Sequence, residues 1–260
     1  MSDTPSLQGT FGSGADRYDR LRPAPPPEAV DFCAPLPGAD VVDVGAGTGK
    51  LTVLLLRRGH RVVAVEPSSA MREQLRARLP HLSVRAARAE ATGLPGASVD
   101  VVTFAQAWHW VDPPAASREV ARILRPGGYV SLLWTMLDSH VGWVDRVQEA
   151  MHSIPLAQQV GTRPGRGADP WAHPPSGPFG SAQRLDMRWS QPMTRSDLRD
   201  LVTTRSYYLE ATAAEQSSLR DATERAVSTE WPDLDDTDEV GLPYVTTVLR
   251  YRREDEADAL

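Results

Sequence analysis

Short apolar runs alternate with longer amphipathic segments over the first half of the chain. Each apolar run suits a buried strand, and between the runs apolar residues recur at helical spacing. This pattern predicts strands that begin near positions 41, 61, 82, 99 and 129, and helices over about 50–58, 69–79 and 115–124. Such alternation is typical of an α/β fold with a doubly wound, mostly parallel sheet, in which ligands bind beyond the carboxyl ends of the strands.

The alternation ends after Trp134. The second half is expected to hold helices over 141–152, 194–201 and 213–227, a Pro- and Gly-rich loop over 161–180, and a strand over 184–189. The β-rich run 244–249, within the segment 239–252, is expected to return to the sheet as an edge strand. The chain then divides into N-terminal lid helices (1–37), a Rossmann-like ligand-binding core (38–136), a cap that contacts the substrate (137–237), a C-terminal strand (238–253) and an acidic tail (254–260).

The first apolar run breaks into a glycine turn. Residues 41–49 are Val-Val-Asp-Val-Gly-Ala-Gly-Thr-Gly. Glycine permits close approach of a ligand to the backbone, and the turn can present N–H groups to it. The next apolar run ends at Glu66, which stands 66 − 45 = 21 positions after Gly45. An acid about 20 positions after such a turn binds a ribose in nucleotide-binding βαβ units, so an adenosine-type cofactor is predicted.

The spacing of the glycines narrows the choice of cofactor. An NAD fingerprint needs glycine or alanine at Lys50, and a phosphate-binding P-loop needs glycine at Val44 and a hydroxyl residue at Leu51. The pattern that remains, D-x-G-x-G-x-G with an acid ending the next strand, resembles the class I S-adenosylmethionine (SAM)-dependent methyltransferases. That resemblance implies SAM as cofactor and S-adenosylhomocysteine as product.

Two later motifs extend the resemblance. Ala89-Glu90 opens a segment A-E-A-T-G-L-P after the third strand, and residues 106–110 read Gln-Ala-Trp-His-Trp at the end of the fourth. The second stretch is similar to the ubiquinone/menaquinone and trans-aconitate methyltransferase branch (methyltransferase type 11-like), which acts on small molecules. The similarity covers residues 11–134 and, weakly, 242–246. It implies a seven-stranded Rossmann-like sheet with an antiparallel C-terminal strand and a helical cap.

The resemblance also assigns residues to the cofactor. Glu66 is expected to hold the ribose, and Asp43 to bind the amino group of SAM or to support the turn itself. Arg22 could pair with the methionine carboxylate, and Tyr18 could close over it. Arg88 stands where the family usually has aspartate, a departure that weakens the adenine assignment to the next two residues. The expected cofactor residues are Tyr18, Arg22, Asp43, Gly45, Ala46, Gly47, Glu66, Pro67, Met71, Ala89, Glu90, Ala105 and Gln106.

His109 is the candidate catalytic residue. Its ordinary pKa near 6.5 would let it accept a proton from a hydroxyl or amine nucleophile, and the alternative is a contact with the substrate. The implied reaction is transfer of a methyl group to an O, N or C nucleophile of a small molecule. The expected substrate-binding residues are Trp108, His109, Trp110, His140, Trp143, Tyr207 and Tyr208, with core packing favoured for at least one of the two tryptophans beside His109.

Composition excludes several classes of protein. The net charge is −6 and Lys50 is the only lysine, which argues against a nucleic-acid substrate. There is no long apolar run, secretory signal pattern or metal-binding spacing, and Cys33 is the only cysteine. A cytoplasmic monomer or homodimer without a metal or membrane partner is therefore expected. The Arg-, Pro- and Ala-rich composition is associated with GC-rich bacteria, where similar enzymes often modify secondary metabolites.

Three alternatives remain open at this point. An NAD-dependent oxidoreductase would use Glu66 on the ribose equally well, although Lys50 and the later motifs count against it. A SAM-binding enzyme without methyl transfer, such as a cyclase or a carboxyl-SAM type, would share the fold. The third is a non-enzymatic SAM-binding regulator.

Overall fold

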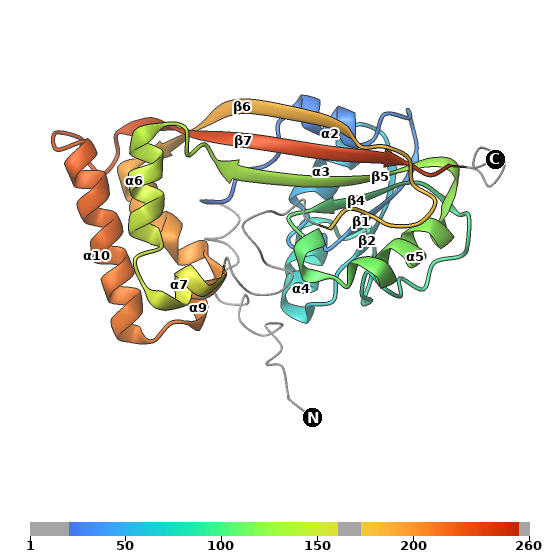
Figure 1. Ribbon diagram of the computed structural model, residues 1–260, viewed down its shortest axis with the longest axis horizontal. Coiled ribbons are helices and arrows are strands. Elements are labelled where there is room, and N and C mark those ends of the chain that lie inside the picture. Colours follow the sequence, from blue (N-terminus) through green and yellow to red (C-terminus); the bar gives the residue numbers. More distant parts are fainter. Residues whose placement is uncertain (1–20, 161–172, 255–260) are drawn as a thin grey trace.

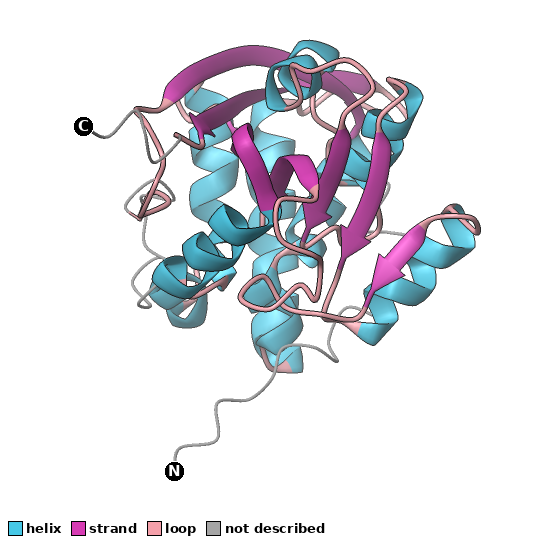
Figure 2. Ribbon diagram, turned by 90° about the vertical axis from the view of Figure 1, so that its right-hand side faces the viewer, coloured by secondary structure: helices cyan, strands magenta, loops and turns pink. Residues whose placement is uncertain are grey.

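The computed structural model describes residues 21–160 and 173–254, and its centre is a seven-stranded sheet (Figures 1 and 2). The strand order is β3-β2-β1-β4-β5-β7-β6. β1 to β5 run parallel, and β7 runs antiparallel to both of its neighbours. The expected fold class is confirmed. The strands are β1 (Asp40–Val44), β2 (Arg61–Val65), β3 (Ser83–Arg85), β4 (Val99–Ala105), β5 (Leu124–Leu137), β6 (Gln183–Thr194) and β7 (Glu239–Arg252).

The place of the C-terminal strand differs from the expectation. β7 lies between β5 and β6, so the prediction of an edge position is wrong, and β6 is the edge strand. Every second residue along most of β6 is exposed, whereas the second half of β7 is mostly buried. An interior strand needs apolar residues on both faces, which the run from Val245 to Leu249 supplies only in part. The order of strands in the sheet is set by tertiary packing, and the local sequence of this run does not reveal it.

Helices cover both faces of the sheet (Figure 2). The side chains of consecutive strand residues point to opposite faces, and Leu132 and Leu133 on β5 show the result. Leu132 packs in the cluster that includes Val120 and Ile123 of α5 (Pro113–Ile123), whereas Leu133 packs with residues of α2 (Pro27–Cys33). The remaining elements of this half are α3 (Lys50–Arg57), α4 (Ser69–Arg78) and the short 3₁₀ helix η2 (Trp108–Trp110).

A second group of helices gathers at one end of the molecule, where the long strands β5, β6 and β7 extend beyond β1, β2 and β4 (Figure 1). We call this group the cap. Its apolar residues form one cluster with the ends of the long strands, including Leu137, Leu242 and Tyr244. No helix within residues 21–160 and 173–254 combines the length and apolar character needed to cross a membrane. The cap comprises α6 (Gly142–Met151), α7 (Pro155–Val160), α8 (Arg195–Asp200), η3 (Leu201–Thr204), α9 (Ser206–Glu210) and α10 (Ala213–Glu230).

Candidate active site

The glycine turn lies where the strand order reverses, because β1 pairs with β2 on one side and with β4 on the other. In doubly wound sheets this switch point forms the ligand crevice. Gly45 has φ +69° and Gly47 has φ +57°, a left-handed backbone that favours glycine. A Cβ on Gly45 would stand 2.5 Å from the Cβ of Ala107, whereas a Cβ on Gly47 would meet nothing within 4 Å. Gly45 thus lets the turn pack against the end of β4, and Gly47 borders open space.

Glu66 is fixed beside this turn by two backbone N–H groups. Gly47 N donates to Glu66 Oε2 at 2.9 Å, and Ser68 N donates to Oε1 at 2.8 Å. The side chain is buried, and burial raises the pKa of the carboxyl group while the two N–H bonds oppose that rise. Each carboxylate oxygen has two lone pairs, so both oxygens retain capacity to accept a ligand hydroxyl. The carboxylate is therefore held in a defined position at the carboxyl end of β2.

Asp43 lies beneath the turn rather than in the crevice. Its Oδ2 accepts from Thr52 Oγ1 at 2.6 Å, and its Oδ1 accepts from Thr103 Oγ1 at 3.0 Å. The side chain is 1% exposed, and burial raises its pKa to about 6. These bonds join β1, α3 and β4. Of the two roles expected for Asp43, support of the turn agrees with this geometry.

The end of β4 carries a strained residue. Gln106 has φ +55°, which is uncommon for a residue other than glycine. Its backbone N donates to Leu133 O at 2.8 Å, and its Nε2 donates to Thr135 O at 2.6 Å, so β5 holds it in place. A left-handed backbone at such a residue costs about 1–3 kcal/mol and is concentrated at functional sites. Ala105, expected at the cofactor, packs with apolar residues on the sheet face that α2 and α3 cover.

The segment after β3 is joined to the start of α5. Ala89 is buried, and Glu90 Oε1 accepts from Asp112 N at 2.9 Å. Arg88, the departure from the family pattern, donates through Nε to Glu90 Oε2 at 3.4 Å. Glu90 therefore holds the loop that was expected to border the adenine. On the other side of Glu66, Pro67 is exposed and Met71 is buried in the first turn of α4.

The three aromatic residues of η2 differ in their surroundings. Trp108 is 2% exposed, packs edge-on against Phe104 and donates through Nε1 to His173 O at 2.6 Å. It is a core residue in this structure, and the substrate contact expected for Trp108 stays a prediction. Trp110 is 41% exposed, and the half-buried His109 ring lies 5.1 Å from it. Trp108 is thus the tryptophan for which core packing was anticipated.

Arg22 and several of the expected substrate-binding residues lie in the cap or contact it. Arg22 Nη2 donates to Thr204 O at 3.2 Å, which places the guanidinium at the cap. Trp143 packs edge-on against Trp231, with ring centroids 4.5 Å apart. Tyr207 and Tyr208 are buried in the apolar cluster of the cap. The remaining expected residue at this end of the sequence, Tyr18, lies outside the described residues.

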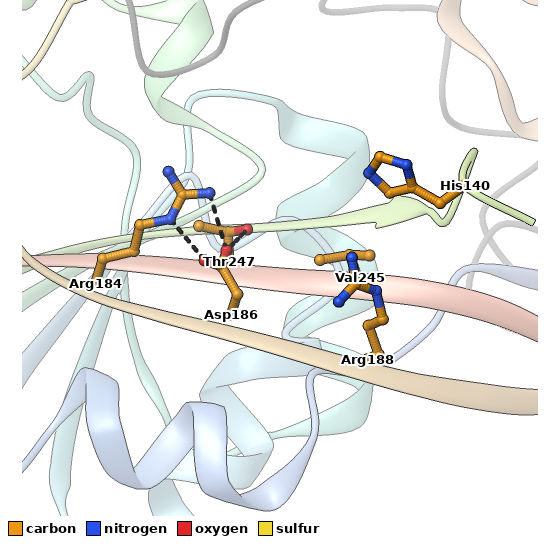
Figure 3. Close-up of a pocket in the computed structure, with 6 residues that line it drawn as sticks. All are labelled: His140, Arg184, Asp186, Arg188, Val245 and Thr247. Carbon is orange, nitrogen blue, oxygen red and sulfur yellow. Dashed lines mark hydrogen bonds and ion pairs between the residues drawn. The ribbon is translucent and has the colours of Figure 1, made fainter.

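His140 is exposed and lines a pocket of about 360 Å³ over β6 and β7 (Figure 3). The two arginines of this pocket are paired: Arg184 with Asp186, and Arg188 with the buried Asp138. None of the described residues form a group of three or more His, Cys, Asp or Glu side chains suited to a metal ion. The other residues that line the pocket are Arg184, Asp186, Arg188, Val245 and Thr247.

Known proteins that are similar to this chain share its fold, and the matched region includes the glycine turn. The family profile described as a methyltransferase domain matches residues 42–132. Over 243 residues the chain is 40% identical to an uncharacterized methyltransferase of Mycobacterium tuberculosis, with 93% of this chain and 94% of the relative covered. The chain belongs to the methyltransferase family.

More distant relatives of this methyltransferase also match over nearly their full length. A methyltransferase-like protein of Schizosaccharomyces pombe is 27% identical over 251 residues, which cover 94% of this chain and 96% of the relative. Among solved structures, a candidate type II methyltransferase from Anaeromyxobacter dehalogenans superposes with a TM-score of 0.67 at 26% identity. The match covers 89% of this chain and 97% of that one. The architecture is that of the class I SAM-dependent methyltransferases.

Several residues of the methyltransferase site were not anticipated from the sequence. Thr52 and Thr103 bind Asp43, and Ser68 both donates to Glu66 and caps α4 through its side chain. Ser68 was detectable, because serine is a preferred cap just before a helix. The two threonines carry no such local signal, since they meet Asp43 only when β1, α3 and β4 assemble.

Proposed function

We propose that this protein transfers the methyl group of SAM to an O, N or C nucleophile of a small molecule. The observation that carries the proposal is the buried Glu66 carboxylate, held against the Gly47 N–H at the switch point of the sheet. A fixed carboxylate next to a turn with an open side suits the two hydroxyls of a ribose. Pro67, Met71, Ala89 and Glu90 are assigned to the ribose and adenine.

The chain's own residues then act mainly by positioning. When bound, SAM supplies a methyl group with an activated leaving group. The protein aligns the nucleophile and excludes water. His109 follows the strained end of β4, and we assign it to accept the proton of the nucleophile. Trp110 is the exposed aromatic beside it and is assigned to the acceptor.

Calorimetric titration with SAM, S-adenosylhomocysteine and NAD tests the cofactor assignment. The first two are expected to bind and NAD is not. Glu66→Ala removes hydrogen bonds between a charged group and ligand hydroxyls, each worth about 1.5–3 kcal/mol, so the affinity for SAM should fall at least about tenfold. Glu73→Ala, at an exposed carboxylate of α4, is the matched control and should leave the affinity unchanged.

The same preparations locate the role of His109. His109→Ala should retain the SAM affinity of the wild type. With a substrate that the wild type methylates, it should lower the rate of S-adenosylhomocysteine formation by about 10²-fold or more, the usual contribution of a general base.

Binding of NAD alone would overturn the methyltransferase proposal for this site. Unchanged SAM affinity in Glu66→Ala would overturn the assignment of the carboxylate.

A further inference from the structure

Two buried phenol hydroxyls in the cap have no hydrogen-bond partner within the described part of the chain. Tyr207 on α9 and Tyr244 on β7 are each 3% exposed, and their hydroxyl oxygens are shielded from solvent. A buried hydroxyl left in this way costs about 1–3 kcal/mol, and most such groups in folded proteins are paired. The fold therefore keeps two donors available for a bound group.

Two arginines carry positive charge that acts on both phenols. Burial raises the pKa of Tyr207 and of Tyr244, and the charges of Arg205 and Arg22 oppose that rise at each tyrosine. The hydrogen bond from Arg22 Nη2 to Thr204 O sets its guanidinium next to the backbone of Arg205. The same two arginines thus act on the same two phenols.

The surroundings strengthen the interaction of these charges with a ligand. Leu137, Met193 and Leu242 belong to the same apolar cluster as the two tyrosines, and electrostatic interactions are stronger in such a low-dielectric setting. The His152 ring lies 5.3 Å from that of Tyr207, and burial lowers the pKa of His152, with the charge of Arg205 acting in the same direction. Both effects disfavour the charged form of His152, whereas Arg22 and Arg205 carry positive charge.

The register of the sheet places Tyr244 relative to the carboxyl end of β4. Ala105 at the end of β4 pairs with Leu133, and four residues further along β5 Leu137 pairs with Tyr244. At about 3.3 Å per residue, Tyr244 stands about 13 Å beyond the end of β4. Gln106 donates to Thr135 O between these two points. A small molecule can span that distance.

The surface pocket of Figure 3 offers a contrast. There, Arg184 and Arg188 are each paired with a carboxylate at 2.7 Å and 3.1 Å, so their charge is compensated within the protein. The tyrosine hydroxyls of the cap have no such partner. Tyr207 and Tyr244 therefore keep hydroxyl donors open to an anion, whereas carboxylates already compensate the charge of the surface arginines.

We propose that the methyl acceptor carries an anionic oxygen group, a carboxylate or a phosphate, and that Arg22, Arg205, Tyr207 and Tyr244 bind this group in the cap. The inference rests on the proposed function, since it names the acceptor class of the same enzyme. Guanidinium groups and hydroxyls both donate to such oxygens, and charge-assisted bonds of this kind are the strong ones. Arg22, first expected at the methionine carboxylate, is thereby assigned to the acceptor.

Benzoate and its neutral analogue benzamide are the probes for this site. Each is titrated calorimetrically into the protein with and without saturating S-adenosylhomocysteine. Benzoate should bind at least about tenfold more tightly than benzamide, because the charged group forms the stronger hydrogen bonds. Phenyl phosphate, titrated in the same way, distinguishes the sources: tighter binding than benzoate indicates a phosphate group, and weaker binding indicates a carboxylate.

Variants connect the preference to three of the four residues. Arg205→Gln should abolish the discrimination between benzoate and benzamide and leave the affinity for SAM unchanged. Tyr207→Phe and Tyr244→Phe should weaken benzoate binding by about three- to tenfold, yet leave the thermal midpoint without ligand unchanged or raised, because each removes a hydroxyl with no partner. Tyr251→Phe, at a buried tyrosine of β7 in the other cluster, is the matched control and should not alter benzoate binding.

The outcomes separate this inference from the proposed function. If SAM binds but benzoate is not preferred, or if neither probe binds, the anion site is wrong and the methyltransferase proposal stands. A fall in the midpoint of both Tyr→Phe variants would show that the hydroxyls have a structural partner and would likewise overturn the inference. Absence of SAM binding to the wild type would overturn the proposed function itself, whatever the response to benzoate.

Discussion

Two buried carboxylates at the ends of neighbouring strands illustrate how position decides the role of a residue. Asp43 gives its oxygens to two threonine hydroxyls and joins β1, α3 and β4, whereas Glu66 takes two backbone N–H groups and borders the turn. The sequence singled out both acids by their place after an apolar run. Only the structure shows that Asp43 is a buried structural residue and that Glu66 lies at the crevice.

The buried Asp43 predicts a pH-dependent stability. Burial raises its pKa from 3.8 to about 6, so the folded protein holds the proton more tightly than the unfolded chain. The resulting stability is fully present below about pH 4 and is lost as the pH rises through about 6. Asp43→Asn does not titrate, so relative to the wild type it should gain on the order of 2–3 kcal/mol between about pH 4 and pH 7. Urea unfolding at a series of pH values measures this difference.

A control with the opposite sign is available at Asp186. The hydrogen bond from Arg184 lowers the pKa of Asp186, so its stabilising contribution is present at neutral pH and lost on acidification. Asp186→Asn should therefore lose stability relative to the wild type as the pH rises, by a small amount because the side chain is half exposed. A difference between Asp43→Asn and wild type that stays constant with pH would contradict the prediction.

At the scale of elements, local capping rules account for several helix starts. Asp112 caps α5 and Thr194 caps α8 through their side chains. Thr212 and Glu215 form a reciprocal capping box at the start of α10, in which each side chain binds the backbone N–H of the other residue. The sequence places α10 within a few residues on periodicity alone, although its box pattern was present to be found.

The capping box predicts a measurable loss on substitution. Thr212→Ala removes the acceptor for the Glu215 N–H and should lower the free energy of unfolding by about 1 kcal/mol. Thr229→Ala, near the end of the same helix, is the control, because its exposed hydroxyl only donates to Arg225 O. That change should stay within about 0.5 kcal/mol. Equal losses for the two variants in urea unfolding would show that the box has no special effect.

At the scale of the whole molecule, two apolar clusters share two continuous strands, β5 and β7. Leu132 and Leu249 belong to the sheet cluster, whereas Leu137 and Leu242, further along the same two strands, belong to the cap cluster. β5, β6 and β7 pair through both regions without interruption. The cap therefore has no flexible connection to the sheet along these strands.

This continuity predicts that the cap and the sheet unfold together. Far-UV circular dichroism and tryptophan fluorescence should give coincident urea transitions, as expected of a two-state process. Trp231→Phe, which alters the edge-on pair with Trp143 in the cap, should lower both midpoints equally. Two separate transitions, or a fluorescence midpoint that falls alone, would show instead that the cap unfolds independently.

The sequence by itself determined the features that depend on near neighbours in the chain. Apolar runs and periodicity gave the strands and helices of the core, and the glycines at 45 and 47 with Glu66 located the crevice, because turn geometry and strand ends are local properties. Strand order, in contrast, was decided by tertiary packing, and β7 therefore took an interior place rather than the expected edge.

The surroundings of individual side chains were likewise decided by the tertiary structure. Trp108 and Trp110 are two positions apart in one motif, yet one is in the core and the other is exposed. Arg22, Tyr244 and the near neighbours Arg205 and Tyr207 come from three distant parts of the chain and come together only at the junction of the cap with the long strands. Burial and charge proximity depend on contacts between remote segments, and no local pattern in a single sequence records them.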